Sequence, residues 1–196
     1  MKSKTYISGF TLIETLVAIS ILMIAVVVPL SIVAGALQSS FYSRDQITAV
    51  YLAQDAMEYV KNVRDSNALK NIEASINGGG QISWLEGLKD CLLPPPSKAC
   101  KIDTTRGASG EVSSEDKEHP ADLFVSDSGV YGYSSGTDSR FSRVIQIEPV
   151  GGDASDEAQV TITVSWTGSS AYPGRTFTVS ENIYNVWKQA GEEQTP

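Results

Sequence analysis

The sequence predicts an α+β fold in which one long N-terminal helix packs on a C-terminal antiparallel β-sheet. A predominantly apolar run from Leu16 to Leu37 predicts the first half of that helix. A more polar segment follows, with apolar residues at three- and four-residue steps, and predicts the second half. Three stretches rich in β-branched and aromatic residues, separated by glycine-containing turns, predict the sheet.

Residues 1–9 form a short basic segment in front of the apolar run. They include Lys2 and Lys4 and no acidic residue, which predicts that they stay on the cytoplasmic side of a membrane. As a helix with a rise of about 1.5 Å per residue, the run from Leu16 to Leu37 is long enough to cross a hydrocarbon core of about 30 Å. The sequence therefore predicts a single membrane crossing, with the rest of the chain outside the cytoplasm.

Glu14 is the only formally charged residue between Lys4 and Arg44. A carboxylate inside the bilayer costs about 2.5–3.5 kcal/mol on insertion scales, so it indicates a function and a partner. Because Glu14 lies near the start of the helix, an interfacial position in contact with water is the alternative.

The run Gly9-Phe10-Thr11-Leu12-Ile13-Glu14 resembles the prepilin motif of type IV pilins and type II secretion pseudopilins. The resemblance implies a pilin fold whose transmembrane first half is also the filament core. It also implies that prepilin peptidase cuts after Gly9 and methylates the new amino group of Phe10. Glu14 would then pair with the Phe10 ammonium of a neighbouring subunit, which offsets the desolvation of both charges and fixes their register.

Ala34-Gly35-Ala36 supports a different interpretation of the N-terminus. This pattern fits an ordinary signal peptidase site, whose use would release a soluble domain starting at Leu37. The apolar run is longer than the usual signal core of about 7–15 residues, and an acid such as Glu14 is out of place in one. We therefore favour the prepilin interpretation.

Pro29 removes one backbone donor from the apolar helix and predicts a kink there. After residue 37 the helix is expected to continue to about residue 66, and Ser66-Asn67 to end it. One face of this second half is apolar and is expected to pack on the sheet, as the pilin headgroups imply; it consists of Ala49, Leu52, Ala53, Ala56, Met57, Val60 and Val63.

Short elements are expected between the long helix and the sheet. The spacing of Leu69, Ile72 and Ile76 predicts a short second helix, ended by the glycines at 78–80. A further short helix is expected from Ile82 to Leu88, and residues 103–121 are expected to form a long exposed loop.

Cys91 and Cys100 enclose a proline-rich loop. In an exported chain a close cysteine pair predicts a disulfide. A zinc site is the alternative, but it needs about four ligands and His119 is the only histidine.

The strands are expected over residues 141–150, 158–167 and 175–187. Their short connections favour an antiparallel meander, and residues 130–133 suggest a smaller hairpin. Strand periodicity places four apolar side chains on one face, where they would receive the apolar stripe of the helix: Val160, Ile162, Val164 and Trp166.

The composition argues against several classes of function. The formal net charge of −8 opposes nonspecific nucleic-acid binding, which needs clustered cations. The sequence contains no phosphate loop, nucleophile elbow or cysteine–histidine pairing that would indicate an enzyme, and no cofactor is expected. One weak calcium candidate remains, in a turn with hard oxygen donors: Asp153, Asp156 and Glu157.

The sequence thus predicts four regions. A cleaved leader (1–9) precedes a transmembrane and filament-core half-helix (10–37), an amphipathic half-helix (38–66) and a globular head (67–196). The leading hypothesis is a structural subunit, specifically a minor pilin, with pilin subunits, prepilin peptidase, the assembly machinery and membrane lipid as partners. The alternatives are a type II secretion pseudopilin and a membrane-anchored extracellular binding domain.

Overall fold

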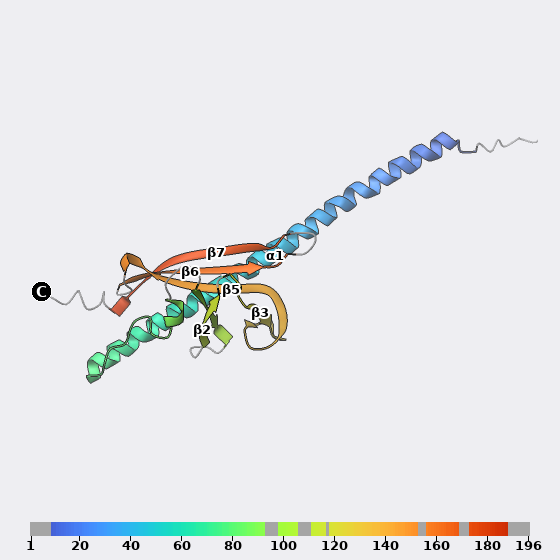
Figure 1. The fold of residues 1–196 in the computed structure, drawn as a ribbon. Coiled ribbons are helices and arrows are strands. Elements are labelled where there is room, and N and C mark those ends of the chain that lie inside the picture. The colour runs from blue at the N-terminus through green and yellow to red at the C-terminus, as the bar shows by residue number, and fades with distance from the viewer. Residues whose placement is uncertain are drawn as a thin grey trace, which may run out of the picture. The chain divides into compact units, whose positions relative to one another are not determined.

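The structure is a computed structural model that describes residues 9–92, 98–105, 111–116, 118–152, 156–168 and 173–187 (Figure 1). The chain divides into two compact units, Met1–Arg44 and Asp45–Pro196, and each is described by itself. One helix, α1 (Leu12–Asn77), contributes to both units. The fold is the α+β arrangement that the sequence predicts, with α1 and an antiparallel sheet.

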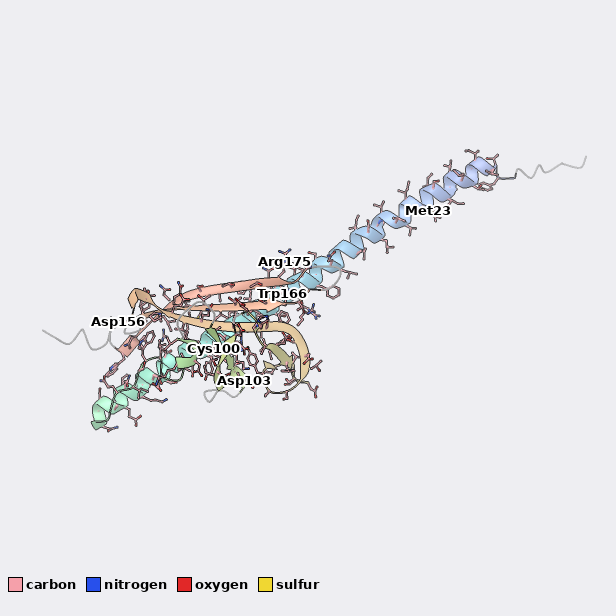
Figure 2. All side chains as sticks on the ribbon, in the orientation of Figure 1. Met23, Cys100, Asp103, Asp156, Trp166 and Arg175 are labelled. Carbon is pink, nitrogen blue, oxygen red and sulfur yellow. A yellow bond between two sulfur atoms is a disulfide. The ribbon has the colours of Figure 1, made fainter. Side chains whose placement is uncertain are left out.

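In the first unit, α1 is apolar and exposed. Every residue from Gly9 to Phe41 is exposed, and the side chains around Met23 stand out from the helix (Figure 2). The helix is long and apolar enough to cross a membrane. The hydroxyls of Thr15, Ser20 and Ser31 donate to the carbonyls of Leu12, Leu16 and Val28 at 2.8–2.9 Å, so these polar groups are satisfied within the helix, as a lipid environment requires.

Pro29 lies inside α1 and does not end it. The residues before and after Pro29 belong to the same helix, Leu12–Asn77. The kink expected at this residue stays a prediction.

In the second unit, α1 buries the apolar stripe that the sequence predicts. Its apolar members are at most 6% exposed: Ala49, Leu52, Ala53, Ala56, Met57 and Val60. Val63 continues the same stripe but is only partly buried.

The expected end of the helix at Ser66-Asn67 is wrong, because α1 continues to Asn77. Asn67 and Asn71 are buried in the helix and use their side chains to bind a neighbouring segment. The helix ends at Gly78, whose φ of 72° suits glycine. The N–H of Gly79 donates to the carbonyl of Ala74 at 2.8 Å, the bond of a Schellman cap. The separate short helix expected around Leu69 to Ile76 is therefore the last part of α1.

The helix expected from Ile82 to Leu88 is also wrong. This segment forms turns, followed by a 3₁₀ helix, η1 (Lys89–Cys91). Asn71 exchanges two hydrogen bonds with the backbone of Ile82, at 2.8 and 2.9 Å, and Asn67 donates to the carbonyls of Trp84 and Glu86. Since these carbonyls accept bonds from α1, they are not used in a helix of their own.

The described residues form one antiparallel sheet of seven strands. The strands are β1 (Lys98–Asp103), β2 (Glu111–Asp116), β3 (Asp122–Val125), β4 (Tyr131–Gly132), β5 (Thr137–Pro149), β6 (Glu157–Trp166) and β7 (Arg175–Tyr184). Along one edge β5 pairs with β6, which pairs with β7. Along its other edge β5 pairs with β3 near one end and with β1 at Cys100. A short 3₁₀ helix, η3 (Val150–Gly152), follows β5.

The predicted meander is confirmed as β5, β6 and β7. The predicted face of β6 is confirmed too, with all four of its side chains at most 5% exposed: Val160, Ile162, Val164 and Trp166. The hairpin suggested at residues 130–133 is present, as β4 paired with β3.

The long exposed loop expected over residues 103–121 is wrong. This stretch includes the end of β1 and the whole of β2, which pair from Lys98 with Asp116 to Asp103 with Glu111. The sequence of β2 is polar, so it shows little strand periodicity. Backbone pairing and the Lys101–Glu115 ion pair at 3.2 Å hold it instead.

Candidate functional site

The expected cleavage point lies just before the start of α1. Gly9 and Phe10 are outside the helix, and Phe10 is 76% exposed. Thr11 precedes the first helical residue, and its hydroxyl accepts a hydrogen bond from the backbone N–H of Glu14 at 3.3 Å. Thr11 is therefore the N-cap of α1, and Gly9 and Phe10 are exposed and lie outside the helix.

Glu14 is the third residue of the helix, so Thr11 and Glu14 have the spacing of a capping box. A negative charge in the first turn also favours the helix dipole. In the described part of the chain, no cation pairs with the Glu14 carboxylate. Glu14 thus suits the start of the helix and also has a charge that a partner could pair with. Substitution by glutamine distinguishes these two roles, because glutamine also suits a capping box but carries no charge.

Residues 4–28 match the family model of the prokaryotic N-terminal methylation motif. The chain carries a prepilin-type signal. The matched range includes Gly9, Phe10 and Glu14, so the resemblance that the sequence suggests is confirmed. Comparison of the chain with curated proteins and with solved structures gives no match.

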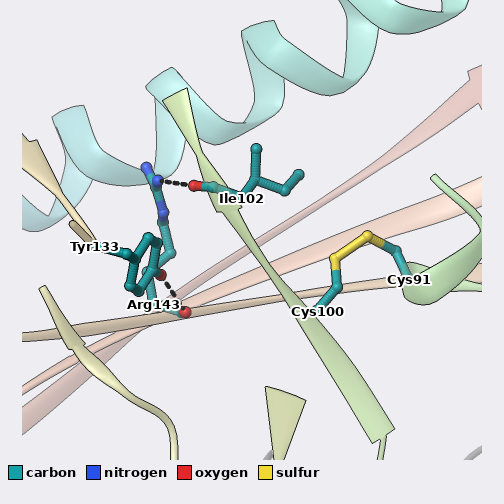
Figure 3. The surroundings of a disulfide bond; sticks show 5 residues. All are labelled: Cys91, Cys100, Ile102, Tyr133 and Arg143. Carbon is teal, nitrogen blue, oxygen red and sulfur yellow. Dashed lines mark hydrogen bonds between the residues drawn. A yellow bond between two sulfur atoms is a disulfide. The ribbon is translucent and has the colours of Figure 1, made fainter. Parts of the chain in front are cut away.

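In the second unit, a buried arginine on β5 connects three elements. The Arg143 side chain is 1% exposed. Its Nη1 donates to the Leu52 carbonyl at 2.8 Å and to Asp55 Oδ2 at 2.9 Å. Its Nη2 donates to the Ile102 carbonyl at 2.8 Å, as Figure 3 shows. One guanidinium therefore ties α1, β1 and β5 together, which fixes the helix on the sheet.

Two further ion pairs join α1 to the sheet. Arg140 of β5 donates to Asp45 at 3.1 Å, and the Asp45 side chain is 3% exposed. Lys61 pairs with Glu181 of β7 at 2.7 Å, where both side chains are more than one-third exposed.

These arginine contacts are not among the sites predicted from the sequence. A signal was present, since Arg143 stands at an alternate position among Phe141, Ile145 and Ile147, where strand periodicity places a core-facing side chain. A charge at such a position indicates a buried, paired group.

Tyr133 completes the polar cluster around Arg143. Its hydroxyl donates to the Arg143 carbonyl at 3.0 Å (Figure 3). Burial raises the pKa of Tyr133 above its ordinary range, which the nearby Arg143 partly opposes. The hydroxyl therefore stays protonated and able to donate in neutral solution.

The predicted disulfide is present between Cys91 and Cys100 (Figure 3). It joins η1 to β1, and both cysteines are at most 2% exposed. The bond fixes the turn segment after α1 to the sheet. It also fits an exported, oxidising location, because disulfides persist there.

The remaining candidate ligands do not gather into a site among the described residues. His119 is 83% exposed and lies 3.6 Å from Asp116, whose pKa is lowered chiefly by a hydrogen bond from the backbone N–H of Glu118. In the described ranges, no group of three or more His, Cys, Asp or Glu residues is placed to hold a metal. Of the calcium candidates, Asp153 lies outside the described residues. Asp156 is exposed, and Glu157 accepts a hydrogen bond from Asn182 at 2.8 Å.

Proposed function

We propose that the chain is a structural subunit, specifically a minor pilin, of a type IV pilus. The observation that carries the proposal is a prepilin-type signal at residues 4–28, which overlaps the start of a predominantly apolar helical segment that is exposed from Leu12 to Phe41. An apolar segment with no cover from its own chain needs lipid or other subunits around it. Lipid before assembly and neighbouring subunits after it satisfy that need in turn.

In this proposal, prepilin peptidase removes residues 1–9 on the cytoplasmic side and methylates Phe10. Lys2 and Lys4 keep the leader in the cytoplasm, so the head lies outside. Residues 10–37 span the membrane and later form the filament core. The helix continues from residue 38 to Asn77, and the head that it joins is presented on the filament surface.

Cleavage also permits assembly. Before cleavage the nitrogen of Phe10 is part of a peptide bond and carries no charge. After cleavage its ammonium pairs with Glu14 of a neighbouring subunit, and each charge gains the partner that the described part of one chain does not supply. A subunit shifted along the axis would leave both charges unpaired in an apolar core, so the pair fixes the register.

The proposal is tested by expressing Glu14→Gln in the native host and measuring the subunit in sheared surface fibres and in membranes. Glutamine keeps the capping geometry and removes the charge. We expect normal membrane insertion and cleavage but at least about a tenfold loss from fibres, since an uncompensated buried charge costs more than about 1.4 kcal/mol.

Asp65→Asn is the matched control, because it removes an exposed carboxylate from the same helix. We expect it to assemble like the wild type. Normal amounts of Glu14→Gln in fibres would contradict the proposal. Wild-type protein found only in a periplasmic filament would instead identify a type II secretion pseudopilin.

A further inference from the structure

A recess of about 370 Å³ lies beside α1 in the second unit, next to the β3–β4 hairpin. Its volume falls in the range of small-molecule sites, about 300–1,000 Å³. The residues that matter for its chemistry are Tyr51, Asp55, Thr104, Val130 and Tyr131.

Tyrosine and aliphatic side chains form the apolar part of the recess. Tyr51 is 67% exposed and Val130 is 51% exposed. Tyr131 is partly buried, and its ring meets Phe141 edge-on at 5.9 Å between centroids. The recess therefore combines an exposed tyrosine, Tyr51, with Tyr131, whose ring contacts Phe141. A tyrosine offers both an apolar ring face and a polar hydroxyl.

Asp55 supplies a fixed hydrogen-bond acceptor. Its Oδ2 accepts bonds from Arg143 at 2.9 Å and from Thr104 at 2.7 Å. Within the described residues both contacts fall on Oδ2, so Oδ1 has no protein donor, and the side chain is 49% exposed. Two bonds thus orient the carboxylate and leave one of its oxygens for a ligand.

The charge of Asp55 is largely offset, because the buried Arg143 guanidinium lies against it. A site for a cation would gain from an uncompensated carboxylate, and a site for a purely apolar ligand would not include an oriented acceptor. The lining instead suits a neutral molecule with an apolar face and several hydroxyl donors.

We propose that this recess binds a neutral saccharide. One pyranose ring lies against Tyr51, and its hydroxyls donate to Asp55 Oδ1 and bond with the Thr104 hydroxyl. The proposal depends only on the second unit. It stands whether or not the chain is a filament subunit.

The test is saturation-transfer difference NMR and calorimetric titration of the full chain with the methyl glycosides of glucose, galactose, mannose and N-acetylglucosamine. The detergent must be zwitterionic, since alkyl glycoside detergents carry the proposed ligand as their headgroup. We expect at least one glycoside to bind. Tyr51→Ala should weaken its binding by about tenfold, the effect of losing about 1.4 kcal/mol of ring contact, and Tyr51→Phe should retain most of it.

Tyr184→Ala is the matched control, because Tyr184 is an exposed tyrosine that does not line the recess. It should bind like the wild type. Absence of binding by all four glycosides would overturn the proposal, as would undiminished binding by a folded Tyr51→Ala. Tetramethylammonium that binds in place of the glycosides, with the same dependence on Tyr51, would overturn it in favour of a cation site.

Discussion

The two halves of α1 differ in how their apolar residues are arranged. From Leu12 to Phe41 apolar side chains occupy every face, and all are exposed. From Ala49 to Val60 a stripe of apolar residues on one face is buried, although single apolar residues elsewhere on this half, such as Ile47 and Tyr51, are exposed. Asp45, Asp55 and Lys61 form ion pairs with the sheet. The distribution of apolar residues around a helix therefore decides what the helix packs against. An all-round apolar helix needs partners outside its chain, whereas a striped one packs on its own sheet.

Replacing one leucine in each half tests this difference most strongly. Leu52 is 5% exposed and Leu30 is 66% exposed. Leu52→Ala should lower the free energy of unfolding of the head by about 3 kcal/mol, because it leaves a cavity. Leu30→Ala should change it by less than about 0.5 kcal/mol. Urea unfolding of the full chain in detergent, followed by the fluorescence of the buried Trp84 and Trp166, measures both; equal losses would break the comparison.

Arg143→Met should have the next largest effect, a loss of about 2 kcal/mol. The substitution leaves the carbonyls of Leu52 and Ile102 without the guanidinium and Asp55 without its ion pair. In a double-mutant cycle, Asp55→Asn should cost less in the Arg143→Met background than in the wild type. Additive losses would show that Asp55 and Arg143 do not stabilise the helix–sheet contact together.

Lys61→Met should have the smallest effect, below about 1 kcal/mol. The Lys61–Glu181 pair is short, at 2.7 Å, but its side chains are 36% and 46% exposed, and exposed pairs stabilise little. The unfolding midpoint in urea should hardly change, and the small loss should vanish in high salt. A loss of unfolding free energy as large as that of Arg143→Met would contradict the distinction between buried and exposed ion pairs.

The sequence predicts those parts that regular periodicity governs. The apolar stripe from Ala49 to Val60 and the alternation along β6 can be predicted because both depend only on local spacing. The burial of both sets of side chains confirms the two predictions. The prepilin-type signal is also a local pattern, and the motif match at residues 4–28 confirms it.

The parts that depend on contacts between distant residues could not be predicted. Asn67 is a weak helix former, yet α1 continues through it, and its side chain donates to the carbonyls of Trp84 and Glu86. β2 is too polar to show as a strand, and its pairing with β1 decides its structure. Strand periodicity indicates that Arg143 is buried, but it does not indicate the three acceptors, which lie on two other elements.

The account depends on the removal of residues 1–9, which makes α1 the first helix of a mature subunit that starts at Phe10. The intact mass of the protein isolated from its native host tests this removal most directly. We predict a chain that starts at Phe10, carries one added methyl group and lacks two hydrogens because of the Cys91–Cys100 bond. A mature protein that still begins at Met1, or one that begins at Leu37, would contradict the account.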